Sequence, residues 1–236
     1  MTDAAVGPLL AIDTATSRTV VAIERSDGSP AEASWPSGQR HGEELLAGLD
    51  RLLAAEGIGL GSIQAIVVGT GPGGFTGLRV GLATAKGLAH ALSIPIVGIP
   101  TSTALLAAAD AASQAADPVA GGPRPAGSAL LLPAGPRDRV LVDPAGPRLL
   151  PAGTEPELTP TVRLVAVDLD GRAPSEAVER GIAALAGLGP SLLRLGRARL
   201  ARGEVDDLAR LVPEYVSLPR GVTASGGSIE WSRDPR

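Results

Sequence analysis

A glycine-rich turn is the stretch of this sequence whose residue types point most clearly to chemistry. It covers residues 69–77, contains five glycines and follows an apolar segment at residues 65–68. Glycine permits positive φ and lets other atoms approach the backbone closely. A helix that begins where the turn ends would present free N–H groups to an anion. The turn therefore has the residue types of a phosphate-binding loop.

Three kinds of phosphate-binding loop can be compared with this turn. A Walker A loop ends in Gly-Lys followed by Ser or Thr, and this turn contains no lysine. The spacing of Gly69, Gly71 and Gly74 matches a dinucleotide-binding fingerprint. That fingerprint expects an acidic residue about 20 positions later, whereas the next acidic residue here is Asp110. The third kind is the nucleotide site of actin-like proteins and sugar kinases.

An actin-like site pairs such a turn with an early hairpin that carries an aspartate. Asp13 would lie near a metal-bound phosphate, with the hydroxyl groups of Thr14 and Thr16 as donors. The candidate residues of a residual nucleotide site are therefore Asp13, Thr14, Thr16, Gly71, Gly73 and Gly74. The second phosphate clamp is not recognisable, because its nearest match, residues 168–171, lacks a following glycine. The competing interpretation is that Asp13 caps the turn at a strand end.

Other catalytic groups are scarce in the sequence. The chain has no cysteine and two histidines, His41 and His90, which lie in separate predicted helices and form no His-x-x-x-His pair. Neither histidine accompanies a Gly-x-Ser-x-Gly nucleophile motif. We expect no catalytic residue and no metal site.

Hydrophobic patterns predict the elements that must position the turn. Strands are predicted at residues 9–12, 19–24, 31–35, 65–68 and 95–99, and helices at residues 45–53, 78–92 and 102–116. The resulting order is β-β-β-α-β-α-β-α, an antiparallel meander followed by two parallel crossovers. It predicts an α/β protein with the actin-like, ribonuclease H-like fold.

The second half of the chain has a weaker pattern, rich in Pro, Gly and Ala over residues 117–160. Strands are predicted at residues 130–132, 140–142 and 164–167, and helices at residues 175–188 and 190–203. We expect two subdomains. Residues 1–116 would form the N-terminal ribonuclease H-like unit, and residues 117–236 a smaller, degenerate C-terminal unit with a loose polar tail.

Two of the predicted helices carry more apolar residues than one buried face requires. The helix at residues 78–92 is apolar nearly all round, and the helix at residues 45–53 is rich in leucine. A helix of this kind is buried on more than one side, either by the second half of the chain or by a partner. The interpretation as a partner-docking surface assigns to it Leu45, Leu49, Leu52, Leu78, Leu82, Ala85 and Ala89.

Charge and hydropathy limit the binding partners and the cellular location that can be expected. The net charge of −4 argues against broad nucleic-acid binding, which needs many cationic residues. The predicted last helix carries arginines that form either a solvated face or a minor contact to tRNA or an acidic partner, namely Arg194, Arg197, Arg199 and Arg202. With no signal peptide and no long apolar stretch recognisable, we expect a cytoplasmic protein without a membrane span.

Several of these motifs together resemble the TsaB family, also called YeaZ-like. The matching motifs are residues 10–16 (LAIDTAT), 39–41 (QRH), 69–81 (GTGPGGFTGLRVG) and 97–101 (VGIPT). The resemblance covers about the first 110 residues strongly, and the later Pro213-x-Tyr215-Val216 is similar to the family's closing segment. Residues 134–140 (AGPRDRV) depart from the family's usual Asp-Ala-Arg-x-x-Glu-Val-like hairpin.

The resemblance implies an actin-like ATPase fold and a role in making threonylcarbamoyladenosine on tRNA. The family's catalytic relative, TsaD, carries two histidines on the helix after the fifth strand, whereas residues 101–109 here contain none. The resemblance therefore implies a non-catalytic subunit that pairs with TsaD through its first two helices, joined by the ATPase TsaE.

The resemblance also implies a homodimer for the isolated chain, only indirect or weak contact with tRNA, and no cofactor other than ATP or ADP at a subunit interface. The alternative is an autonomous ATP-binding enzyme of the actin-like or sugar-kinase class. The missing second clamp is the feature that separates the two.

Overall fold

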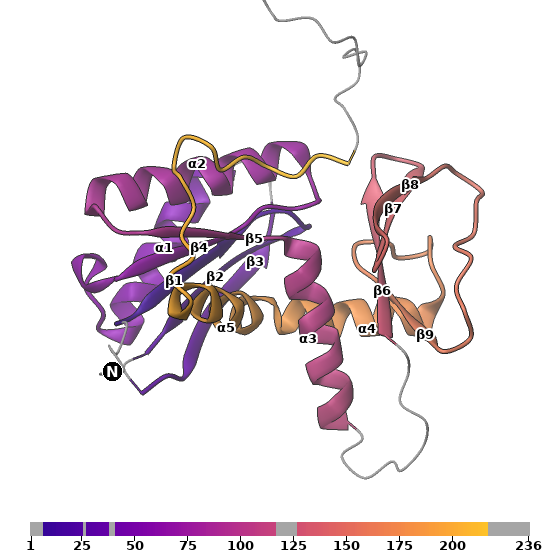
Figure 1. Ribbon diagram of the computed structural model, residues 1–236, viewed down its shortest axis with the longest axis horizontal. Coiled ribbons are helices and arrows are strands. Elements are labelled where there is room, and N and C mark those ends of the chain that lie inside the picture. Colours follow the sequence, from indigo (N-terminus) through magenta and orange to yellow (C-terminus); the bar gives the residue numbers. More distant parts are fainter. Residues whose placement is uncertain (1–6, 26, 38–40, 117–126, 217–236) are drawn as a thin grey trace, which may run out of the picture.

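In the computed structural model, the protein contains two mixed β-sheets, each covered by helices (Figure 1). The structure describes residues 7–25, 27–37, 41–116 and 127–216. The polar tail and the Pro- and Gly-rich link at residues 117–126, both singled out in the sequence, lie outside these residues.

The first sheet has five strands in the order β3-β2-β1-β4-β5. They are β1 (Leu9–Asp13), β2 (Arg18–Glu24), β3 (Pro30–Pro36), β4 (Ala65–Gly69) and β5 (Ile96–Ile99). β1, β2 and β3 pair antiparallel, whereas β4 runs parallel to β1 and β5. The meander and the two parallel crossovers predicted from the sequence are therefore confirmed.

Helices bury both faces of this sheet. They are α1 (His41–Glu56), α2 (Phe75–Leu92), α3 (Thr101–Ala116) and α5 (Leu188–Ala201), with a short 3-10 helix at Leu60–Ser62. Side chains alternate between faces along a strand, so Leu10 and Ile12 pack with α1 and α2. Leu9 and Ala11 pack with α3 and α5 on the other face. This double burial explains why β1 and β4 are apolar throughout.

The second sheet has four strands in the order β8-β7-β6-β9. They are β6 (Gly127–Ala134), β7 (Asp138–Asp143), β8 (Gly146–Leu150) and β9 (Val162–Ala166). β8 has no counterpart in the sequence predictions, because it contains a glycine and a proline and most of its side chains are exposed. The sheet repeats the order of the first one without a strand at the position of β5, and is the degenerate copy of an actin-like fold.

Helix α4 (Ser175–Ala186) lies along β9 where that missing strand would pair. Arg180 Nη1 donates to the carbonyl oxygen of Leu164 at 2.7 Å. A Cβ atom on Gly181 would collide with the carbonyl oxygen of Ala166. The helix thus covers backbone groups of an edge strand that would otherwise be open to pairing.

The C-terminal part of the chain is shared between the two sheets. We expected residues 117–236 to form one unit, but α5 and the segment that follows it return to the first sheet (Figure 1). We call this following segment, residues 204–216, the C-terminal strap. α5 begins at Leu188, two residues before Pro190. A Cβ on Gly196 would lie 2.2 Å from Val67 Cγ2, so glycine lets the helix sit directly on β4.

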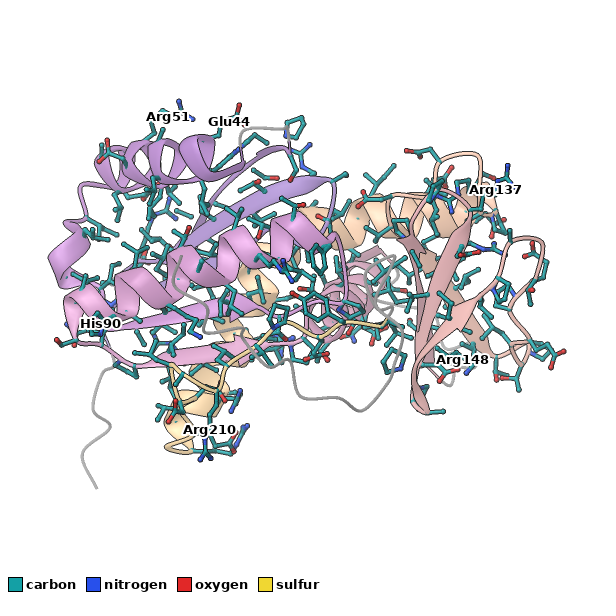
Figure 2. All side chains as sticks on the ribbon, turned by 90° about the horizontal axis from the view of Figure 1, so that it is seen from above. Glu44, Arg51, His90, Arg137, Arg148 and Arg210 are labelled. Carbon is teal, nitrogen blue, oxygen red and sulfur yellow. The ribbon has the colours of Figure 1, made fainter. Side chains whose placement is uncertain are left out.

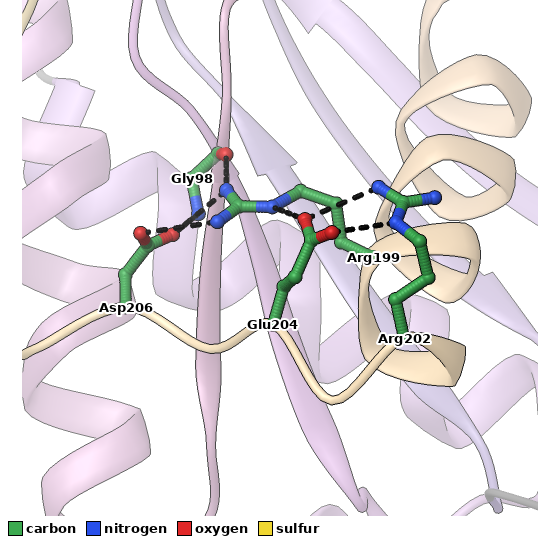
Figure 3. Close-up of polar contacts among 5 residues, drawn as sticks. All are labelled: Gly98, Arg199, Arg202, Glu204 and Asp206. Atoms are coloured by element: carbon green, nitrogen blue, oxygen red, sulfur yellow. Dashed lines mark hydrogen bonds and ion pairs between the residues drawn. The ribbon is translucent and has the colours of Figure 1, made fainter.

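The strap completes the exposed edge of β5. The Asp206 N–H donates to the Ile96 oxygen at 2.9 Å, and the Gly98 N–H donates to Asp206 Oδ2 at 2.7 Å. Arg199 Nη1 donates to the Gly98 oxygen at 2.8 Å and to Asp206 Oδ2 at 3.0 Å (Figure 3). Edge-strand groups that would be free are thereby satisfied.

Candidate functional site

The glycine-rich turn lies directly against the turn between β1 and β2. The Gly74 N–H donates to the Ala15 oxygen at 2.7 Å, and Thr14 Oγ1 donates to the Gly77 oxygen at 2.7 Å. A Cβ atom on Gly73 would lie 2.1 Å from the Ala15 oxygen, and one on Gly77 would lie 2.1 Å from the Thr14 oxygen. These glycines therefore let two backbone segments pack against each other.

The sequence analysis offered the hydroxyl groups of Thr14 and Thr16 as nucleotide ligands, but in the structure both form hydrogen bonds to the protein backbone. Thr14 Oγ1 is buried under α2, where a Cβ on Gly81 would lie 2.2 Å from it. Thr16 Oγ1 donates to the Arg18 oxygen at 3.1 Å and accepts from the Arg18 N–H. Both threonines thus stabilise the β1–β2 turn and its contact with α2.

Asp13 is fully buried at the end of β1. Its Oδ2 accepts from Thr101 Oγ1 at 2.6 Å, and its Oδ1 accepts from the Ala15 N–H at 2.8 Å. Thr101 Oγ1 also accepts from the Gly71 N–H at 3.0 Å, and a Cβ on Gly69 would collide with Asp13 Oδ2. Burial raises the pKa of Asp13 to about 6, although both hydrogen bonds act to lower it. The carboxylate thus links the end of β1 to the start of α3 and packs against Gly69 at the end of β4. This is the geometry of a carboxylate that caps the turn at a strand end.

The β1–β2 turn and residues 168–171, the nearest match to the unrecognised second clamp, contact each other across the subdomains. Asp168, from the candidate second clamp, has a φ of 58°, which is uncommon outside glycine. Its Oδ2 accepts from the Ser17 N–H at 2.6 Å, and its Oδ1 accepts from Ser17 Oγ. This contact joins the β1–β2 turn to the turn that follows β9.

The helix residues assigned to partner docking lie in the core, which corrects the prediction. Less than a tenth of each side chain is exposed in Leu45, Leu49, Leu52, Leu78, Leu82, Ala85 and Ala89. The reason is that the apolar stripes of α1 and α2 both face the sheet and each other. Gly81, between two of these residues on α2, packs directly on Thr14.

Other residues of the same two helices face outward. Leu46 on α1 is 52% exposed, and Ala83 and Gly87 on α2 are exposed. A Cβ on Gly87 would have no neighbouring atom within 4 Å. Figure 2 shows Glu44 and Arg51 on the side of α1 turned away from α2.

Most arginines of α5, and Arg202 directly after it, form ion pairs within the chain. Arg197 pairs with Glu24 on β2 through its Nε at 2.8 Å. Arg199 contacts Glu204 and Asp206, and Arg202 pairs with Glu204 (Figure 3). Arg194 is exposed. The arginines that pair within the chain tie α5 to β2 and to the C-terminal strap.

One cluster near the turn has no counterpart in the site residues predicted from the sequence. Tyr215, at the end of the strap, lies beside Phe75 and Arg79 at the start of α2. The sequence signal was the Pro-x-Tyr-Val segment at residues 213–216, but nothing local to it indicates a contact 140 residues away along the chain.

The described residues contain neither a cluster of metal ligands nor a membrane-spanning helix. Within residues 7–25, 27–37, 41–116 and 127–216, no group of three or more His, Cys, Asp or Glu side chains could hold a metal ion. Over the same residues, no helix is both long and apolar enough to cross a membrane.

Comparison with known proteins finds similarity to TsaB, TsaD and YeaZ proteins. The family model described as TsaD, tRNA N6-adenosine threonylcarbamoyltransferase, matches residues 30–122. TsaB of Haemophilus influenzae is 38% identical over 112 residues, 48% of this chain and 47% of that protein. TsaB of Escherichia coli is 37% identical over 93 residues, 39% of this chain and 40% of that protein. The chain spans about half the length of these relatives, or less.

A solved structure extends the similarity to the second subdomain. YeaZ from Pseudomonas aeruginosa superposes with a TM-score of 0.64 and 25% identity, covering 89% of this chain and 99% of that one. The strand order, the glycine-rich turn and the similarity to proteins called TsaB and YeaZ agree with one another. The chain is therefore similar to TsaB proteins in sequence over about half of its length or less, and to YeaZ in fold over most of it.

Proposed function

We propose that this chain is a non-catalytic subunit of the machinery that makes threonylcarbamoyladenosine on tRNA. In this role it pairs in the cytoplasm with a TsaD-like catalytic subunit and works with a TsaE-like ATPase. The similarity to TsaB proteins and to the TsaD family model supports the pathway.

The closed glycine-rich turn is the observation that carries the non-catalytic part of the proposal. In a phosphate-binding loop, backbone N–H groups and glycines face open space that an anion can enter. Here the Gly74 N–H is bonded to Ala15, and the space above Gly73 and Gly77 is filled by the backbone of residues 14–15. The turn therefore supports a structural role, in which it fixes the start of α2.

The partner-binding surface in this proposal is the outward face of α1 and α2. Leu46, Ala83 and Gly87 offer one exposed apolar side chain and two small residues. Small residues allow the backbone of a partner helix to approach closely, and an exposed leucine gains about 1.5–3 kcal/mol when fully buried. The surface thus suits a helix pair from a TsaD-like subunit or from a second copy of the chain.

A binding measurement with the TsaD-like subunit of the same organism tests this role. The variant Leu46→Glu with Ala83→Glu should lose at least about 100-fold in affinity, because it places two charges in the interface. The matched control is Ile182→Glu with Ala183→Glu, which makes the same changes at exposed positions of α4. Equal affinity of the docking variant and this control would contradict the docking surface.

Calorimetry separates the proposal from an autonomous ATP-binding enzyme. Titration of the isolated chain with ATP and Mg²⁺ should give no tight binding and no ATP turnover. Tight binding that is lost in Asp13→Asn, together with turnover, would favour the enzyme instead.

A further inference from the structure

A groove with a mostly apolar lining lies between α5 and the hairpin that joins β2 to β3. It has a volume of about 510 Å³. The hairpin side is lined by Glu24, Gly28 and Pro30. The helix side is lined by residues at helical spacing, namely Pro190, Leu193, Arg194, Arg197, Ala198 and Ala201. We call it the α5 groove, and it lies on the opposite face of the first sheet from α1 and α2.

Two arginines line the α5 groove, and they differ in their partners. Arg197 Nε donates to Glu24 Oε2 at 2.8 Å, so these two charges neutralise each other. Arg194, one turn earlier on α5, is exposed and makes no hydrogen bond or ion pair with any residue that the structure describes. An occupant that complements this groove would therefore bring small apolar side chains and one carboxylate.

The chain enters the first sheet beside this groove. Residues 1–6 lie outside the described residues and join them at Gly7. The Gly7 carbonyl oxygen accepts a hydrogen bond at 3.4 Å from Nη2 of Arg197, which lines the groove. Six extended residues reach about 20 Å, whereas the part of α5 that lines the groove is only about 17 Å long. The segment is therefore long enough to reach either end of the groove from Gly7.

The side chains of this segment match the groove. Residues 1–6 (MTDAAV) contain four apolar residues, one threonine and Asp3, which is their only acidic residue. The two longer segments outside the described residues join the chain elsewhere. Residues 117–126 connect α3 to β6, and residues 217–236 follow Val216, which lies beside β6 and β7. Position and composition thus both favour residues 1–6 as the occupant.

We propose that residues 1–6 occupy the α5 groove, with their apolar side chains against its lining and Asp3 paired with Arg194. In this arrangement the segment ties α5 to the β2–β3 hairpin. It also keeps the groove and Arg194 from other partners, such as an RNA phosphate or a second copy of the chain. The contact is independent of the proposed function, because it lies across the sheet from the outward face of α1 and α2.

The labelling rate of an engineered thiol in the full chain measures whether the groove is covered. The chain has no cysteine, so Ala198→Cys places a single thiol at an exposed position of the groove. If residues 1–6 cover the groove in about nine molecules of ten, a bulky maleimide should react about 10-fold more slowly than in the same variant without residues 2–6. The matched control is Ala183→Cys, exposed on α4, which should react equally fast with and without the segment.

Charge variants and dilution separate this occupant from the others. Asp3→Asn and Arg194→Gln should each speed the labelling of Ala198→Cys by roughly 1.5–5-fold, as expected for an exposed ion pair. Raising salt from about 50 to about 300 mM should speed it only while both charges are present. Equal rates with and without residues 2–6, or no effect of either charge variant, overturn the proposal.

Two other results would also overturn it. Protection that disappears on dilution of the full chain would identify a second copy as the occupant. Protection that appears only when a tRNA stem-loop is added would identify RNA. Because binding of a TsaD-like subunit is measured separately, failure of this proposal would leave the proposed function standing.

Discussion

Replacing Asp13 by asparagine should change how stability depends on pH. The pKa of Asp13 is about 6 in the folded chain, against an ordinary value of 3.8, because burial penalises its charged form. The folded state therefore holds this proton more tightly than the unfolded state does. As pH rises from about 4 to above 6, the wild-type chain should lose about 2.5 kcal/mol of unfolding free energy through this group. Asparagine has the same shape and does not titrate, so the variant should not show this loss.

Urea unfolding of both proteins between pH 4 and pH 7.5 provides the measurement. The informative quantity is the difference in unfolding free energy between Asp13→Asn and the wild type. Other carboxyl groups with shifted pKa values, such as Asp27 and Glu56, cancel in that difference. It should move by about 2.5 kcal/mol in favour of the variant as pH rises. A difference that stays constant over this range would refute the reasoning that Asp13 is a buried structural carboxylate.

Three further substitutions test the packing of the turn, of α2 and of the strap. Gly73→Ala should cost about 2–4 kcal/mol because its Cβ would lie 2.1 Å from the Ala15 oxygen. Gly87→Ala, where a Cβ would lie in open space, should stabilise α2 by up to about 1 kcal/mol. Thermal unfolding of both variants measures this, and equal effects would contradict it. Asp206→Ala leaves the Gly98 N–H without its acceptor and should cost about 1–3 kcal/mol. It should also promote concentration-dependent association in light scattering by opening the β5 edge, and a variant that stays monomeric at wild-type stability would show that the strap is dispensable.

The first half of the fold could be predicted because its signals are local. β1 and β4 are uniformly apolar, and α2 follows a turn whose glycines mark a tight entry. The actin-like order of elements can be predicted because each of these strands and helices is recognisable from its own residues. β8 could not be predicted, because its stability comes from pairing with β7 and not from its own residues. The return of α5 to the first sheet depends on Gly196 fitting over Val67, which no local pattern reveals.

The site was harder to predict than the fold. The sequence could identify Leu45 and Leu82 as apolar helix residues, but not whether the sheet or a partner covers them; the sheet does. Likewise, it could not show that Tyr215 meets Phe75, since that contact depends on the path of the strap. The periodicity of a helix sequence shows that one face of the helix is apolar. Whether that face is buried in the core or left exposed depends on how the neighbouring elements pack.

The glycine-rich turn shows how the role of glycine can be decided from geometry. A glycine that serves an anion must have open space where its Cβ would be, with nearby N–H groups unbonded. Gly73 fails this test because a Cβ there would meet the Ala15 backbone, and the N–H of its neighbour Gly74 is already bonded to Ala15. Such contacts between backbones cannot yield without moving two elements, so an anion could occupy the space above Gly73 and Gly77 only if the β1–β2 turn moved away from α2. That movement would also break the bond from Thr14 to Gly77. The same residues that resemble a phosphate loop in sequence therefore stabilise the closed form in which α2 is held in place.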